Sequence, residues 1–155
     1  MSEIYLGNPN LKKANTPIQF SAEQIEEFLK CKNDPVYFAQ KYVKIVSLDE
    51  GLVPFQPYKF QEKLIKRFHK NRFNICKMPR QTGKSTTVVS YLLHYAVFND
   101  SVNIGILANK AATARELLGR LQTAYENLPK WMQQGVLVWN RGSLELENGS
   151  KILAA

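Results

Sequence analysis

The feature that most restricts the fold of this chain is a short apolar run, residues 73–77, that leads directly into a loop and then a helix-like stretch. Residues 78–85 read Met-Pro-Arg-Gln-Thr-Gly-Lys-Ser, and residues 85–98 are almost all apolar or small. The first run has the length of a buried strand, and the last stretch suits a helix packed against a sheet. A strand, a loop and a helix that begins at Gly-Lys-Ser are the parts of a phosphate-binding loop. The sequence therefore predicts an α/β domain that binds a nucleoside triphosphate.

The chemistry of such a loop gives each residue type a task. Backbone N–H groups point at the phosphates, Gly83 allows a close backbone approach, Lys84 reaches the outer phosphates and the Ser85 hydroxyl binds magnesium. We therefore expect ATP and Mg²⁺ as cofactors, with Ser85 as the metal ligand. The nucleotide-binding residues predicted in this region are Pro79, Arg80, Gln81, Thr82, Gly83, Lys84, Ser85 and Thr86.

The loop departs from the strict phosphate-loop pattern at its first position, where Met78 replaces glycine. It also contains Arg80, a bulky cation close to Lys84, and such a pair repels unless an anion binds there. A guanidinium at this place can stabilise the charge on a transferring phosphoryl group. Arg80 and Lys84 are thus the predicted catalytic residues. The alternative for Arg80 is an exposed loop side chain without a role.

A second candidate segment, residues 55–61, lies upstream of the loop. Here the Phe60 ring is suited to stack on a base, and the Gln61 amide is suited to read the edge of adenine. Phe60 also lies on an apolar stripe with Leu64 and Phe68 at helical spacing, so a core position explains it equally well. Gln61 has no evident packing reason to be glutamine.

The positive charge of the chain is concentrated around these two segments. Residues 54–84 contain one acid, Glu62, and nine cations: Lys59, Lys63, Lys66, Arg67, Lys70, Arg72, Lys77, Arg80 and Lys84. Their net charge equals the +8 of the whole chain. A basic stretch of this kind suits polyanions such as a nucleotide or DNA. A solvated helix face remains the alternative for the lysines at 59–70.

The remaining pattern predicts helices in the N-terminal half and alternating strands and helices after residue 72. Helices are expected from the Ser21–Gln24 capping box to about Cys31, from Asp34-Pro35 onward with Ile45 on its apolar side, after Pro57, and at 85–98 and 111–127. Strands are expected at 73–77, 102–107, 136–139, 144–147 and 151–153, with a hairpin turn at Asn148-Gly149. This order implies parallel strands with crossover helices.

Composition excludes several other classes of protein. No stretch approaches the roughly 20 apolar residues of a membrane span, and the N-terminus lacks the features of a signal peptide. Cys31 and Cys76 are the two cysteines, and neither belongs to a CxxC pattern or lies beside clustered histidines. We expect two reduced thiols, no cysteine-based metal site and a cytoplasmic location.

Four segments taken in order resemble one known family. They are 57–61 (Pro-Tyr-Lys-Phe-Gln), 76–85 (Cys-Lys-Met-Pro-Arg-Gln-Thr-Gly-Lys-Ser), 105–110 (Gly-Ile-Leu-Ala-Asn-Lys) and 139–150 (Trp-Asn-Arg-Gly-Ser-Leu-Glu-Leu-Glu-Asn-Gly-Ser). From about residue 34 onward the chain is similar to the N-terminal part of the large terminase subunit of contractile-tailed phages. By this resemblance Gln61 recognises adenine, Arg80 is the arginine of the divergent loop, Lys84 binds phosphate and Ser85 binds magnesium. The family also tolerates a residue other than glycine at the Met78 position.

The resemblance also implies a fold and a domain organisation. The fold is an incomplete RecA-like P-loop NTPase domain, with parallel strands, crossover helices and a terminal β-hairpin, after a helical N-terminal segment. We expect a flexible leader at 1–20, the helical segment with the adenine-binding motif at 21–71, and the first part of the ATPase core at 72–155. The Asp-Glu strand and a nuclease domain are expected beyond this chain, which alone should be inactive.

The implied activity is ATP hydrolysis that powers the packaging of double-stranded DNA into procapsids. The implied partners are double-stranded DNA, the portal protein, the small terminase subunit and further copies of the chain on the portal, in the cytoplasm of an infected bacterium. Two alternatives stay open: a helicase-like ATPase, and a non-hydrolysing DNA-binding or assembly module. Met78 and Arg80 favour the terminase over a helicase. Measuring nucleotide affinity distinguishes the non-hydrolysing module from the two ATPases.

Overall fold

A four-stranded mixed sheet organises the C-terminal half of the protein. The computed structural model describes residues 3–155 and places the strands in the order β5-β8-β7-β6. These strands are β5 (Asn103–Ile106), β6 (Val136–Trp139), β7 (Ser143–Leu146) and β8 (Lys151–Ala154). Strands β5 and β8 are parallel, with Ile104 opposite Ile152, and the other two pairs are antiparallel. The four strands predicted after residue 100 are confirmed, and they form one mixed sheet in an α/β arrangement.

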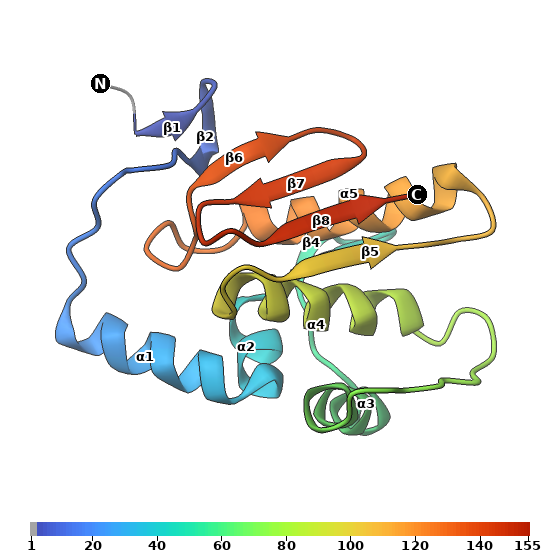
Figure 1. Ribbon diagram of the computed structural model, residues 1–155. Coiled ribbons are helices and arrows are strands. Elements are labelled where there is room, and N and C mark those ends of the chain that lie inside the picture. The colour runs from blue at the N-terminus through green and yellow to red at the C-terminus, as the bar shows by residue number, and fades with distance from the viewer. Residues whose placement is uncertain (1–2) are drawn as a thin grey trace.

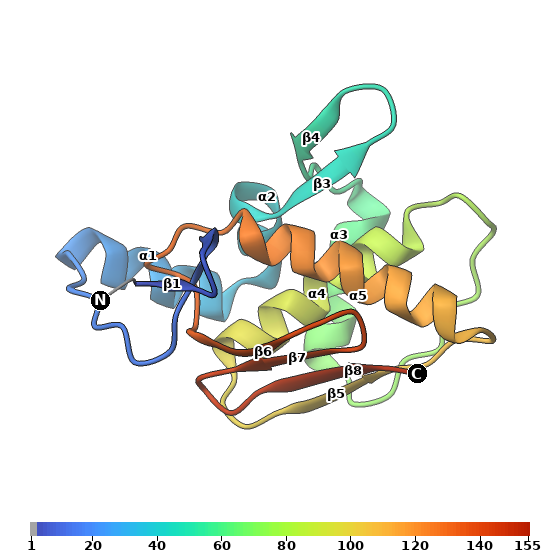
Figure 2. The same ribbon diagram turned by 90° about the horizontal axis from the view of Figure 1, so that it is seen from above.

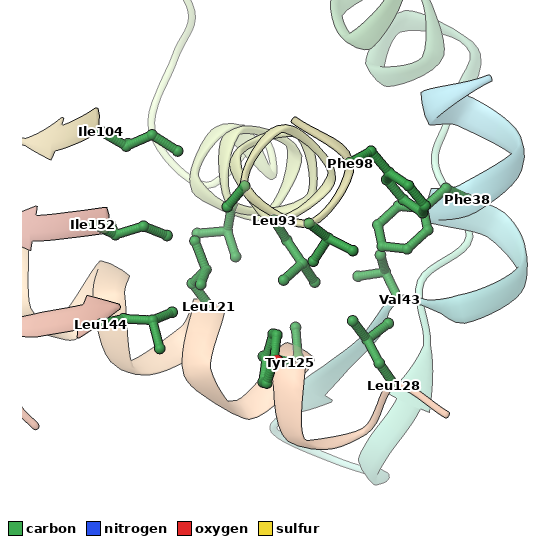
Figure 3. Packing of buried hydrophobic residues seen from close by; sticks show 14 of the residues in the cluster. Phe38, Val43, Leu93, Phe98, Ile104, Leu121, Tyr125, Leu128, Leu144 and Ile152 are labelled. Carbon is green, nitrogen blue, oxygen red and sulfur yellow. The ribbon is translucent and has the colours of Figure 1, made fainter. Parts of the chain in front are cut away.

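Two long helices cover one face of this sheet (Figure 2). They are α4 (Lys84–Phe98) and α5 (Ala111–Glu126). Period-two alternation along the strands directs Ile104, Leu144 and Ile152 toward these helices, where Leu93 and Leu121 meet them (Figure 3). On the opposite face the side chains of β5 and β8 are exposed, among them Leu153 at 57%. The described residues thus form two layers with the core between them.

Three N-terminal helices pack on α4, the first two at its end farther from the loop and the third beside its loop-proximal half. They are α1 (Ala22–Asn33), α2 (Pro35–Tyr42) and α3 (Lys59–Lys70). The predicted starts of the first two are confirmed: Ser21 caps α1 with Gln24 in a capping box, and Asp34 accepts hydrogen bonds from the N–H groups of α2. Phe38 of α2 lies edge-on to Phe98 of α4, with ring centroids 5.3 Å apart. This aromatic contact joins the N-terminal helices to α4, which covers the sheet.

Two hairpins were not predicted from the sequence. They are β1 (Ile4–Tyr5) with β2 (Asn8–Lys12), and β3 (Lys44–Ser47) with β4 (Gly51–Pro54). In the first, Leu11 is 1% exposed and the Lys12 N–H donates to Gln133 Oε1 at 3.1 Å, so the described part of the leader packs on the core. Residues 1–2 of the predicted leader lie outside the described residues. The second hairpin projects from the body (Figure 2), and it contains Ile45, which was wrongly expected in the helix now seen to end at Tyr42.

The predicted strand at 73–77 is wrong. This segment has no strand conformation and joins α3 to α4 as an exposed connection (Figure 1), with Phe73 82% and Ile75 101% exposed. An apolar run becomes a buried strand only where neighbouring strands accept its backbone hydrogen bonds and side chains cover both faces. Strand β5 is the edge of the sheet and pairs only with β8. Within residues 3–155 no strand pairs with the 73–77 backbone, and its side chains are left uncovered.

Candidate phosphate-binding loop

The backbone of the loop alternates in conformation before α4 begins. Gln81 has φ of 57° and Gly83 has φ of 73°, whereas Arg80 and Thr82 lie outside the positive-φ region. Alternation of this kind turns successive N–H groups toward one side and forms an anion-binding concavity, or nest. A positive φ is uncommon for a residue such as glutamine, and backbone strain of this type clusters at ligand sites. The backbone conformation of the loop is therefore of the kind that accommodates an anion.

The first turn of α4 adds further donors to this site. The helix begins at Lys84, its N-cap is Gly83, and no side chain caps it. Its first intrahelical bond runs from the Thr87 N–H to the Gly83 carbonyl at 3.0 Å. The N–H groups of Lys84, Ser85 and Thr86 consequently have no partner within the helix. These groups and the helix dipole favour a negative charge in front of the turn.

Lys84 lies across the mouth of the loop. Its Nζ donates to the Met78 carbonyl at 2.9 Å, and the Thr82 hydroxyl donates to the Pro79 carbonyl at 3.0 Å. Both bonds join the end of the loop to its beginning. Met78 does not have a positive φ, so a side chain at this position is compatible with the loop. This explains in physical terms why glycine is not required there.

Ser85 lies beside a small hollow at the carboxyl end of β5. The hollow has a volume of about 150 Å³, and its lining includes Lys84, Ser85 and Ile106. In open α/β sheets, ligands bind outside the carboxyl ends of the strands. The Ser85 hydroxyl is partly buried and makes no hydrogen bond to any described residue. Apart from Lys84 and Ser85 the hollow is lined by apolar side chains, so the Ser85 hydroxyl is its one neutral polar group.

Gln61 contacts the loop, although in a manner that the sequence did not indicate. Its side chain is buried at 3% exposure; Oε1 accepts from the Tyr58 N–H at 2.8 Å, and Nε2 donates to Gly83 O at 3.2 Å and Thr87 Oγ1 at 3.0 Å. Both amide hydrogens are thus used inside the protein. The expectation that Gln61 lacks a packing reason was wrong, because it joins the start of α3 to the start of α4. Its position as the third residue of a helix, where glutamine side chains reach back to the N-cap, was the available signal.

The other predicted site residues differ in exposure. Phe60 is 45% exposed and stacks on Tyr58, with ring centroids 5.9 Å apart at 12°, so the buried side of α3 is centred on Gln61 and Ile65 instead of Phe60. Pro79, Arg80 and Gln81 are exposed, while Thr82, Gly83, Lys84, Ser85 and Thr86 are partly buried. Arg80 forms no ion pair with any described residue. Its guanidinium is therefore available to a ligand of the loop.

Within residues 3–155 no group of three or more His, Cys, Asp or Glu side chains gathers that could hold a metal ion. Cys31 is a buried thiol and Cys76 an exposed one, and they are not bonded to each other. Burial is the largest cause that raises the pKa of Cys31, to about 12, which keeps this thiol protonated and inert.

A scan of the chain against models of known protein families finds no match. Among the helices in residues 3–155, none is long and apolar enough to cross a membrane.

Proposed function

We propose that this chain is the N-terminal ATPase part of a phage large terminase subunit, with a RecA-like P-loop fold, whose ATP hydrolysis drives double-stranded DNA into procapsids. One observation carries the nucleotide-binding part of this proposal. Lys84 is the first residue of α4 and spans a loop whose backbone alternates in sign of φ. This arrangement presents uncapped N–H groups and an ammonium to the same point, as a triphosphate requires.

The chain supplies binding and charge stabilisation in this proposal. The loop N–H groups and Lys84 hold the phosphates, and Ser85 holds Mg²⁺, which neutralises charge on the outer phosphates when bound. Arg80 stabilises the charge that develops on the transferring phosphoryl group. Phe60, whose ring is half exposed beside the buried Gln61, is positioned to contact the base. Adenine recognition by Gln61 itself requires its remaining acceptor lone pair or a rearrangement of its amide, because both N–H donors are already bonded.

The wider setting is also part of the proposal. The portal protein, the small terminase subunit, further copies of the chain on the portal and the cytoplasm of an infected bacterium follow from the family resemblance. The concentration of the net charge at residues 54–84 supports a polyanionic partner, as DNA is.

The test of this function is the affinity of the chain for Mg-ATP, measured by titration calorimetry. Lys84→Ala should weaken binding on the order of tenfold or more, because it removes the charged ligand of the outer phosphates. Lys32→Ala is the matched control, since it removes an exposed lysine from the distant last turn of α1. Arg80→Ala should keep most of the affinity if it acts mainly on the transition state. Equal affinities for the parent and Lys84→Ala would contradict the proposal.

A non-hydrolysing DNA-binding or assembly module is the second candidate, because the cations of α3 do not depend on the loop. It predicts DNA binding without measurable ATP affinity. A helicase-like ATPase would instead bind ATP at Lys84 and unwind a duplex, so a strand-separation assay distinguishes it from a translocase that moves along intact duplex.

A further inference from the structure

One side of α3 carries five cations, which we call the α3 basic face: Lys59, Lys63, Lys66, Arg67 and Lys70. At about 100° of rotation per residue, the five positions fall within roughly 100° of the helix circumference. All five side chains are exposed. The helix lies at the lower edge of the molecule, below α4 (Figure 1), so its outer side is accessible along its length.

The α3 basic face is not neutralised by the protein itself. The ion pairs within residues 3–155 join Lys41 to Glu27, Arg120 to Glu116 and Lys151 to Glu145, and none involves α3. The single acid of α3, Glu62, borders this face at i,i+4 spacing from Lys66, but it accepts a hydrogen bond from Gln40 Nε2 at 2.9 Å and forms no ion pair with the five cations. Like charges at i,i+4 spacing destabilise a helix. A bound polyanion relieves this repulsion.

The opposite side of α3 is occupied, and this decides between two kinds of polyanionic surface. Gln61 and Ile65 are buried, and Phe68 packs on Tyr91 of α4 with ring centroids 5.6 Å apart. A helix that lies on a membrane needs a free apolar side to insert between lipids. Because the apolar side of α3 is already used in the core, the α3 basic face suits a nucleic acid backbone better than a lipid surface.

We infer that the α3 basic face binds the phosphate backbone of duplex DNA. The choice of DNA as the polyanion rests on the proposed function, whereas the location of the contact rests on α3 alone. A helix of 12 residues is about 18 Å long. Duplex DNA carries roughly ten phosphate charges over this length, enough to pair with every cation of the face. Contacts of this kind are independent of base sequence, as a protein that moves along DNA requires.

The test measures binding of the chain to a fluorescently labelled DNA duplex by anisotropy, without nucleotide, over a series of salt concentrations. The test variant combines Lys63→Gln, Lys66→Gln and Lys70→Gln. The control variant combines Lys32→Gln, Lys44→Gln and Lys130→Gln, three exposed lysines outside α3, and so has the same net charge. The test variant should lose affinity on the order of tenfold or more, with a slope of log K against log salt shallower by about 2.7. The control should change far less, and circular dichroism should show both variants folded.

Three results would overturn the inference. Equal weakening of the two variants would mean that net charge alone attracts DNA. Unchanged duplex binding by the test variant, or no duplex binding by the parent, would mean that α3 is not the contact. Preferential loss of binding to single-stranded DNA or to anionic lipid vesicles would identify a different ligand. If the inference holds, Lys84→Ala keeps its duplex binding in the same assay. The DNA contact is therefore tested independently of the proposed ATP binding.

Discussion

The side-chain amide of Gln61 donates to the carbonyl of Gly83 at 3.2 Å, linking the first turn of α3 to the N-cap of α4. The same amide nitrogen donates to Thr87 Oγ1 at 3.0 Å, and Thr87 Oγ1 donates back to the Gly83 carbonyl at 2.8 Å. One small buried network thus holds the helix that carries the α3 basic face against the residue that shapes the phosphate loop. The two proposed binding surfaces share this connection.

Gln61→Ala should lower the free energy of unfolding by about 1–3 kcal/mol, because it leaves buried polar groups without partners. It should also weaken ATP and GTP binding by the same factor, since the network positions the loop and not the base. The measurements are thermal unfolding and calorimetric titration with both nucleotides. Gln19→Ala, at an exposed glutamine that forms no hydrogen bond within residues 3–155, is the control. A selective loss of ATP affinity would show instead that Gln61 reads adenine.

Gly83→Ala should disturb the loop more than its size suggests. The residue has φ of 73°, and an added Cβ would lie 2.5 Å from Gln61 Nε2. The left-handed conformation alone costs a residue with a side chain about 1–2 kcal/mol. We expect lower stability together with reduced ATP affinity, measured on the same sample. Gly119→Ala, where a Cβ meets nothing within 4 Å, is the matched control and should be stable.

The helices were predictable because their ends are marked locally. Ser21 and Asp34 carry capping signals, and Gly83-Lys84-Ser85 marks the start of α4, so the chain itself contains the information. The segment 73–77 was mispredicted because its apolar composition says nothing about whether a neighbouring strand exists. The β3–β4 hairpin was missed because Lys44–Ser47 and Gly51–Pro54 are short and lack a two-residue turn signal.

Part of the candidate site was also predictable from the sequence. The positions of Lys84 and Ser85 at the helix start follow from the motif and are found there. The burial of Gln61 was not predictable, since it depends on a contact with Gly83, which is 22 residues away in sequence. The positive φ at Gln81 could not be predicted from the sequence, because glutamine rarely adopts a positive φ.

Acid should destabilise the protein through His94. This side chain is 1% exposed, its Nε2 bonds the Cys31 carbonyl at 2.9 Å, and burial is the largest cause that lowers its pKa from 6.5 to about 4. The folded state therefore prefers neutral His94, and the stabilisation is fully present above pH 6.5. It is lost as the pH falls from 6.5 toward 4, because the unfolded chain binds a proton first.

Between about pH 7.5 and pH 5 this linkage should remove roughly 2 kcal/mol of stability, as measured by urea unfolding. His94→Leu should show a much smaller difference between the two pH values, although its stability at the higher pH is reduced by the unsatisfied Cys31 carbonyl. Glu27, whose pKa is lowered to about 2 mainly by a hydrogen bond from Lys41, loses its contribution in a more acidic window, below about 4.5. Equal pH dependence in His94→Leu and the parent would exclude His94 as the cause.

The acids that follow Lys84 form no hydrogen bond or ion pair with residues 78–85, and three of them already have other partners. Glu116 binds Arg120 at 2.6 Å, Glu145 lies 3.5 Å from Lys151, and Glu147 accepts from the Asn15 N–H at 3.1 Å. Asp100 lies beyond the far end of α4, which is about 22 Å long, and Glu126 is the last residue of α5. Only Glu116 among them shares a groove, of about 680 Å³, with a residue of the phosphate-loop helix, Thr86.

We therefore expect this 155-residue chain to bind Mg-ATP without hydrolysing it. Hydrolysis needs a group that orients the water, and a phosphate loop supplies only phosphate and magnesium ligands. The measurement is phosphate release by the purified chain, which should equal that of Lys84→Ala. Release above this background would show that one of the five acids serves as the missing group. Glu116→Gln is then the decisive variant, because Glu116 must exchange Arg120 for water to act. Loss of release in Glu116→Gln, with retained ATP affinity, would place the catalytic acid on α5.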